Sequence, residues 1–110
     1  MVKSLNLIGV HSNTLFRIFV IQICKHCIVS GKVQGVFFRQ TTLDKAKALG
    51  VKGWVRNLPN GTVEAVICGE EDVVQSLCNW LWKGPDAAQV TDIIFTDHDL
   101  ESHTDFTIRF

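Results

Sequence analysis

The run Ser30-Gly31-Lys32-Val33-Gln34-Gly35-Val36-Phe37-Phe38-Arg39 separates an apolar, β-prone segment from a helical pattern. Its two glycines allow backbone turns that direct several N–H groups to one side and form a concave anion site. A helix beginning near Phe38 adds unpaired N–H groups and a partial positive charge. Arg39 adds a permanent cation whose planar donor fork suits phosphate oxygens. The run predicts a phosphate-binding loop; the simpler alternative is an ordinary strand-to-helix turn with a solvated arginine.

The segments on both sides of this loop alternate between strand and helix patterns. A helix over 38–49 is expected to end at Gly50, and a second helix over 70–83 carries an apolar stripe and ends at Gly84-Pro85. The turn Leu58-Pro59-Asn60-Gly61 predicts a hairpin. The expected strands cover residues 23–30, 51–57, 62–68, 90–96 and 105–110.

The order of these elements is β-α-β-β-α-β with a final strand. Such an order is typical of an α+β split βαβ sandwich, in which two helices cover one face of an antiparallel sheet. The chain has 110 residues, of which 46% are hydrophobic and 20% are charged. This size and composition fit a single globular domain.

The charge balance argues against nucleic-acid binding. Lysine and arginine together number 11, as do aspartate and glutamate, so the net charge is zero. An RNA-binding split βαβ domain would need a basic surface and exposed aromatic residues on its central strands. Any anion site must therefore be local, and we expect no nucleic-acid partner.

Four cysteines, Cys24, Cys27, Cys68 and Cys78, raise the alternatives of a metal site and a disulfide framework. Cys24 and Cys27 have zinc-like spacing, but residues three apart in a strand point to opposite faces and cannot share one ion. We expect buried or idle thiols and no bound metal. The four histidines are expected to be packing or surface residues. Nothing here demands an oxidising compartment, so a cytoplasmic location is the default.

Residues 1–22 form an N-terminal extension of uncertain status, and the domain proper is expected over 23–110. The clean apolar run from Ile18 to Cys24 is too short to span a bilayer, so no membrane association is expected. No cleavage site typical of a secretory signal follows it. An accessory strand, a tail and an upstream extension of the true start remain open alternatives.

Asn57 is the second informative polar residue, because it ends an expected strand immediately before the Pro-containing turn. Asparagine at such a place often only caps the turn through its side chain. A role in the site requires that the antiparallel partner strand bring it beside the phosphate loop.

Four parts of the sequence resemble the acylphosphatases. The run from Gly31 to Arg39 looks like the first signature of that family, and Gly53-Trp54-Val55-Arg56-Asn57-Leu58-Pro59-Asn60-Gly61-Thr62-Val63 looks like the second. The stretch after Gly84-Pro85 and the closing Phe106-x-Ile108-Arg109-Phe110 are similar to the end of the family pattern. The likeness covers about residues 23–110 and rests on two long motifs in the right order.

The resemblance implies a ferredoxin-like sandwich and hydrolysis of small acyl phosphates to carboxylate and inorganic phosphate. By that analogy Arg39 binds the phosphoryl oxygens and Asn57 holds the attacking water. The loop residues expected to bind phosphate through their amides are Val33, Gln34, Gly35, Val36, Phe37 and Phe38. A cytoplasmic monomer without cofactor or metal is expected. The alternatives are a non-catalytic anion-binding module and the front domain of a larger carbamoyl-phosphate-using maturation enzyme.

Overall fold

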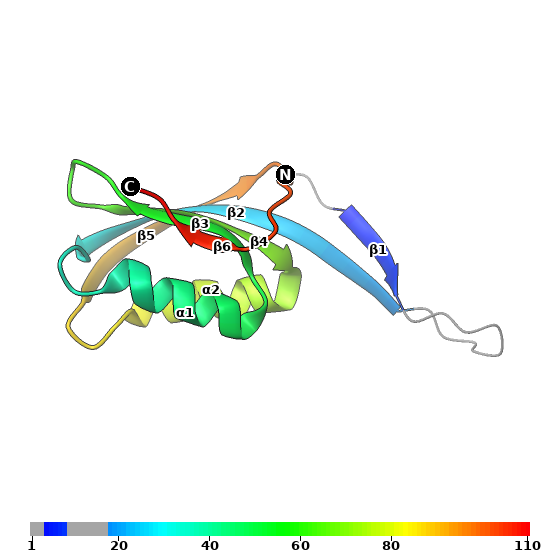
Figure 1. Ribbon diagram of the computed structural model, residues 1–110, viewed down its shortest axis with the longest axis horizontal. Coiled ribbons are helices and arrows are strands. Elements are labelled where there is room, and N and C mark those ends of the chain that lie inside the picture. The colour runs from blue at the N-terminus through cyan, green and yellow to red at the C-terminus, as the bar shows by residue number, and fades with distance from the viewer. Residues whose placement is uncertain (1–3, 9–17) are drawn as a thin grey trace.

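The computed structural model describes residues 4–8 and 18–110, which form a sheet with two helices on one face (Figure 1). This arrangement confirms the expected α+β ferredoxin-like sandwich. None of the described helices is long and apolar enough to cross a bilayer. The elements in chain order are β1 (Ser4–Ile8), β2 (Ile18–Lys32), α1 (Phe38–Leu49), β3 (Lys52–Asn57), β4 (Val63–Glu70), α2 (Glu71–Lys83), β5 (Gln89–His98) and β6 (Phe106–Ile108).

Both helices bury one stripe against the sheet. In α1, Phe38, Thr42 and Ala46 are buried, and Gly50 ends the helix with φ 75°, a left-handed conformation that glycine adopts without a steric penalty. The stripe of α2 is formed by Val74, Leu77, Cys78 and Leu81. Both helices lie within one residue of their expected bounds.

The sheet is built around β2, which pairs antiparallel with β4 on one edge and with β5 on the other. β4 pairs with β3, and β3 with β6. The pairing of β3 with β6 is parallel, whereas an entirely antiparallel sheet was expected. The reason is topological: β5 and β6 lie at opposite edges, so the chain crosses the sheet between residues 98 and 106 and enters β6 running alongside β3.

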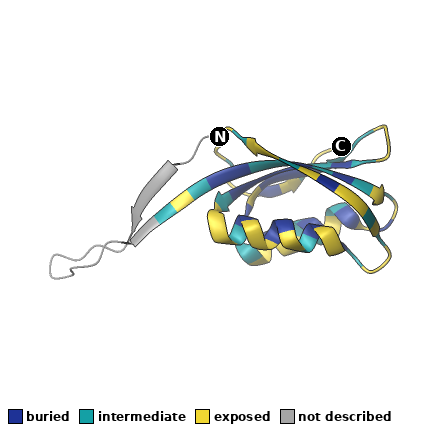
Figure 2. Ribbon diagram, turned by 180° about the vertical axis from the view of Figure 1, so that it is seen from behind, coloured by how far each residue is buried: buried dark blue, intermediate teal, exposed yellow. Residues whose placement is uncertain are grey.

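The sheet has an apolar cluster on each face. The larger one lies between the sheet and the helices, and Figure 2 shows buried residues there while the outward sides of the helices are exposed. The smaller cluster lies on the opposite face, called the open face below. It contains Cys24, Trp54, Val66 and Cys68, with Leu100 of the crossing segment packed on it.

The first domain strand begins earlier than expected. β2 starts at Ile18 rather than Ile23 because the apolar run continues upstream, and its first five residues pair with β1. A boundary after residue 22 would therefore cut β2. Residues 1–3 and 9–17, including His11, lie outside the described part of the chain.

The cysteines differ from expectation. Cys24 and Cys68 form a disulfide, because the register of β2 and β4 sets these two residues directly opposite each other. The prediction of idle thiols is wrong for this pair. Cys27 and Cys78 are free and buried on the helix side, so Cys24 and Cys27 do point to opposite faces.

Candidate active site

The loop between β2 and α1 has the backbone turns that its glycines predict. Gly35 has φ 73° and Phe37 has φ 62°, a left-handed conformation that is rare for a residue with a side chain. α1 begins directly after Phe37. Among the loop and turn hydrogen bonds of residues 18–110, none uses the backbone N–H of residues 34–37 as donor. These amides and the positive end of α1 are therefore free to meet an anion.

Gln34 fixes the position of the loop against the neighbouring hairpin. Its side-chain amide donates to the carbonyl of Leu58 at 2.8 Å and to that of Thr62 at 2.9 Å. Leu58 and Thr62 frame the turn between β3 and β4, so these two bonds hold the loop beside the end of β3. Asn57 is the last residue of that strand.

Asn57 carries a buried polar atom without a partner. Its Oδ1 has no hydrogen-bond partner within the described chain. An orphaned buried acceptor costs free energy, so its presence points to a ligand or solvent contact. The simpler interpretation, that Asn57 caps the turn, is not what is observed. Asn60 does this instead, with its Oδ1 accepting from the backbone N–H of Thr62 at 3.1 Å.

Arg39 lies in the first turn of α1 and is half-buried. Its guanidinium sits 5.2 Å from the ring centroid of Phe110, a cation–π contact. Within residues 18–110, no carboxylate forms an ion pair with Arg39. A guanidinium without a carboxylate partner, next to unpaired amides, keeps its charge available to an anion.

These groups meet in one cavity of about 360 Å³. Arg39 and Asn57, the two residues expected from the sequence analysis to act in catalysis, both line it. Five of the six loop residues expected to bind phosphate also line this cavity. The sixth, Val36, does not, because its side chain is buried in the main core. The lining residues are Val33, Gln34, Gly35, Phe37, Phe38, Arg39, Gln40, Asn57, Ile108 and Phe110.

Three lining residues were not selected from the sequence: Gln40, Ile108 and Phe110. Ile108 and Phe110 alternate with polar residues after Phe106, which is buried, and this alternation places all three on the helix side of the sheet. This alternation can be read from the sequence alone. What the sequence did not reveal is that β6 pairs with β3, which sets its last residue, Ile108, opposite Val55, two residues before Asn57.

Comparisons with known proteins give the family of the chain. The sequence model of the acylphosphatase family matches residues 25–108. The chain belongs to the acylphosphatase family. An acylphosphatase of Nitrosococcus oceani is 56% identical over 70 residues, which cover 64% of this chain and 79% of the relative. The solved acylphosphatase structures from Coxiella burnetii and Bacillus subtilis both superpose with a TM-score of 0.78. They are 46% and 36% identical, each over 80% of this chain and 93% and 99% of their own.

The protein is thus an acylphosphatase, an enzyme that hydrolyses small acyl phosphates to a carboxylate and inorganic phosphate. Within residues 4–8 and 18–110, no group of three or more His, Cys, Asp or Glu side chains is arranged to hold a metal ion. His98 and His103 are only partly exposed and both contact Glu101, while His26 contacts Glu64.

Proposed function

We propose that Arg39 and the amides of residues 33–38 bind the phosphoryl group and that Asn57 orients the water that attacks it. The observation that carries this assignment is that Asn57, whose buried Oδ1 has no partner, lines the same cavity as Arg39, whose guanidinium has no carboxylate partner among residues 18–110. One group accepts a hydrogen bond and the other supplies positive charge, which are the two requirements of hydrolysis at a phosphoryl centre.

The chemistry needs little more than positioning and charge stabilisation. Negative charge spreads over the equatorial phosphoryl oxygens in the transition state, where the guanidinium and the loop amides stabilise it. Water attacks phosphorus while the bond to the carboxylate oxygen breaks, and the carboxylate leaves without acid assistance. A phosphoryl oxygen of the substrate accepts the proton of the water, because the Asn57 amide cannot act as a base.

Two substitutions test these roles with an aryl acyl phosphate such as benzoyl phosphate. Asn57→Ala should lower kcat by about 100-fold or more with little change in KM, the range seen when one transition-state hydrogen bond is removed. Arg39→Ala should raise KM and lower kcat together. Asn79→Ala, on the exposed side of α2, is the matched control. Near-normal kcat in Asn57→Ala would show that another group holds the water.

The pH profile gives a second test of the same assignment. Guanidinium and amide groups do not titrate near neutrality, so kcat should change little between about pH 6 and 8. A steep bell in that range would point to a histidine instead. A chelator should leave the rate unchanged, since the proposal requires no metal.

We further propose that the enzyme is a cytoplasmic monomer that binds neither nucleic acid nor membranes. The zero net charge supports the absence of a nucleic-acid partner. The Cys24–Cys68 disulfide is the observation that tests the cytoplasmic location, because the cytosol keeps most thiols reduced and a persistent disulfide there would be unusual. Counting free thiols after rapid alkylation in intact cells tests this: four free thiols per chain are expected in the cytoplasm and two in an oxidising compartment.

A further inference from the structure

A second cavity opens on the open face of the sheet. Its volume is about 330 Å³, and the Cys24–Cys68 disulfide forms part of its wall. Cys68 lies five residue steps along β4 from Val63, which begins the strand beside the active-site hairpin. At the usual rise this is roughly 17 Å, so the cavity is separate from the active site. Its lining residues are Gln22, Ile23, Cys24, Cys68, Gly69, Leu100, Glu101 and Ser102.

The two sulfur-bearing residues differ in ways that matter for thiol exchange. Cys68 is 6% exposed and Cys24 is fully buried, so an attacking thiolate has more access to Cys68. The backbone N–H of Glu101 donates to Cys24 Sγ at 3.4 Å. A hydrogen bond to the departing sulfur stabilises the thiolate that forms there, and a better leaving group speeds exchange.

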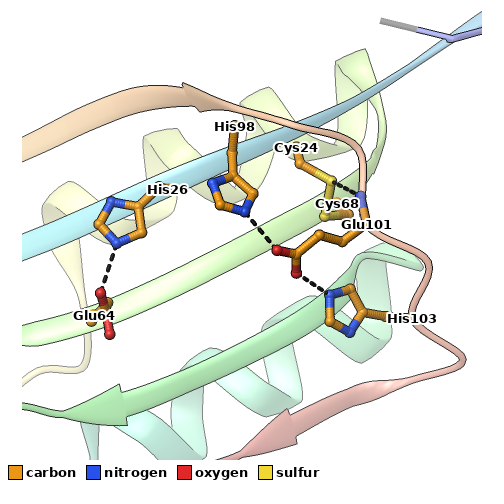
Figure 3. Close-up of polar contacts among 7 residues, drawn as sticks. All are labelled: Cys24, His26, Glu64, Cys68, His98, Glu101 and His103. Carbon is orange, nitrogen blue, oxygen red and sulfur yellow. Dashed lines mark hydrogen bonds and ion pairs between the residues drawn. A yellow bond between two sulfur atoms is a disulfide. The ribbon is translucent and has the colours of Figure 1, made fainter. Parts of the chain in front are cut away.

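The donor over Cys24 is held in place by its own segment. Glu101 contacts His98 and His103, with Oε2 2.6 Å from His98 Nε2 and Oε1 2.8 Å from His103 Nε2 (Figure 3). Figure 3 shows both rings turned toward this carboxylate, which lies beside the disulfide. The hydrogen bonds from His98 and His103 lower the pKa of Glu101. The carboxylate therefore stays ionised and anchored, which keeps its backbone N–H over the sulfur.

We propose that this cavity is a thiol–disulfide exchange site, at which a small thiol attacks Cys68 Sγ and Cys24 departs as the thiolate. The new bond joins the sulfur of the small thiol to Cys68, and the Cys24–Cys68 bond breaks. A second molecule of the thiol then attacks the mixed disulfide and leaves Cys68 as a thiol. Two small thiols are thereby oxidised to their disulfide, and the protein gains two electrons and two protons.

The other two cysteines are poor competitors for this chemistry. Cys27 and Cys78 are buried in the main core on the opposite side of the sheet. The hydrogen bond with Cys78 and burial raise the pKa of the Cys27 thiol, whereas the hydrogen bond with Cys27 lowers the pKa of Cys78. Neither can be modified by a reduced thiol, because the attacked sulfur must already belong to a disulfide and Cys27 and Cys78 are free. Modification is therefore specific for Cys68, and because the site is remote from Arg39 and Asn57 it leaves turnover unchanged in the folded enzyme.

The test uses the full chain in native buffer with increasing concentrations of reduced glutathione. Acid quenching and alkylation give the rate of disulfide loss, and peptide mass mapping locates the adduct. We expect a rate proportional to glutathione concentration and a mixed disulfide at Cys68. A rate independent of glutathione and equal to the global unfolding rate would overturn the proposal, as would an adduct at Cys24.

A matched pair of variants separates the cavity from general accessibility. Ser102→Phe fills the cavity, whereas Thr104→Phe adds the same exposed ring two residues further along the segment, outside the lining. The first should slow exchange by at least about fivefold, and the second should not. Equal rates in both would remove the cavity from the reaction. Hydrolysis of benzoyl phosphate should be unaffected in both variants, so this outcome is independent of the roles proposed for Arg39 and Asn57.

Discussion

Residues in the left-handed conformation shape the phosphate loop, and at Gly35 the effect of this conformation can be measured apart from any steric clash. A Cβ added at Gly35 would meet no atom within 4 Å, and the same is true at Gly50 after α1. Their φ angles, 73° and 75°, are nearly equal. A substitution at either position therefore costs only the backbone preference and no steric clash, which makes the two glycines a matched pair.

We expect Gly35→Ala and Gly50→Ala to lower the free energy of unfolding by a similar amount, about 1 kcal/mol each. Only Gly35→Ala should impair catalysis. A small rotation of its peptide redirects the amides that we propose bind the phosphoryl group, and a displacement of about 1 Å can cost up to 100-fold in rate. Denaturant unfolding and kcat/KM for benzoyl phosphate measure the two effects. Equal activity in both variants would show that the conformation at Gly35 does not organise the site.

At the scale of elements, the open face of the sheet carries an ionic network across β2, β4 and β3. The Glu64 carboxylate accepts a hydrogen bond from Arg56 Nε at 2.6 Å and lies 2.7 Å from His26 Nε2. Burial raises the pKa of Glu64, but the hydrogen bonds from His26 and Arg56 outweigh it, and the net pKa is lowered. A lowered carboxyl pKa stabilises the fold above the unfolded value, about 4.3, and this contribution is lost as the pH falls through the folded value.

The wild-type enzyme should therefore lose more stability between pH 5 and pH 3 than Glu64→Gln. At pH 7 the substitution should cost about 1.5–3 kcal/mol, the range for hydrogen bonds to a charged group. Urea unfolding at each pH gives both values. Asp86→Asn, an exposed carboxylate after α2, is the control and should retain the wild-type pH dependence. If Glu64→Gln shows the wild-type slope as well, the network does not contribute to acid sensitivity.

The Cys24–Cys68 disulfide joins β2 to β4 and closes a long loop. Cys24 and Cys68 are 44 residues apart in sequence, and closing such a loop restricts the unfolded chain by about 4 kcal/mol in the chain-entropy model. The double variant Cys24→Ala, Cys68→Ala should lose up to that amount in free energy of unfolding. Its kcat at low temperature should equal that of the wild type. A parallel loss of kcat in the folded variant would mean that the bridge also shapes the active site.

Both helices were predictable because each has its own local stop signal, Gly50 for α1 and Gly84 for α2. The features that were missed depend on pairing between distant segments. The register of β2 and β4 creates the disulfide, and the pairing of β3 with β6 brings Phe110 to the cavity. The local pattern of apolar and polar residues predicts neither of these strand pairings. Arg39 was selected from its charge and its place after the loop, whereas the role of Asn57 came from the resemblance. The structure adds Gln34 as the residue that holds the loop against the hairpin.

At the scale of the whole molecule, the two ends of β2 have different structural roles. Its C-terminal end leads into the phosphate loop, while its first five residues pair with β1 at the opposite end of the molecule (Figure 1). β1 pairs with no strand other than β2 within the described residues. Among the residues whose burial is described, 20–110, the main core begins at Ile23 and the smaller cluster at Cys24, and residues 20–22 belong to neither.

We therefore expect a chain of residues 23–110 to fold and to hydrolyse benzoyl phosphate with kcat within about twofold of the full chain. The reason is that, in the part of the chain that the structure describes, the residues lining the candidate active-site cavity all lie at or after Val33. Gln22 pairs with Glu70 at the end of the β2–β4 ladder, and this truncation removes that pair. Tm should fall by a few degrees, the change that a loss of about 1 kcal/mol causes in a domain of this size. A second truncation, 18–110, keeps β2 whole and separates the effect of β1 from that of the strand. If 23–110 is unfolded while 18–110 is active, the domain begins at Ile18, and the boundary proposed from the sequence is wrong.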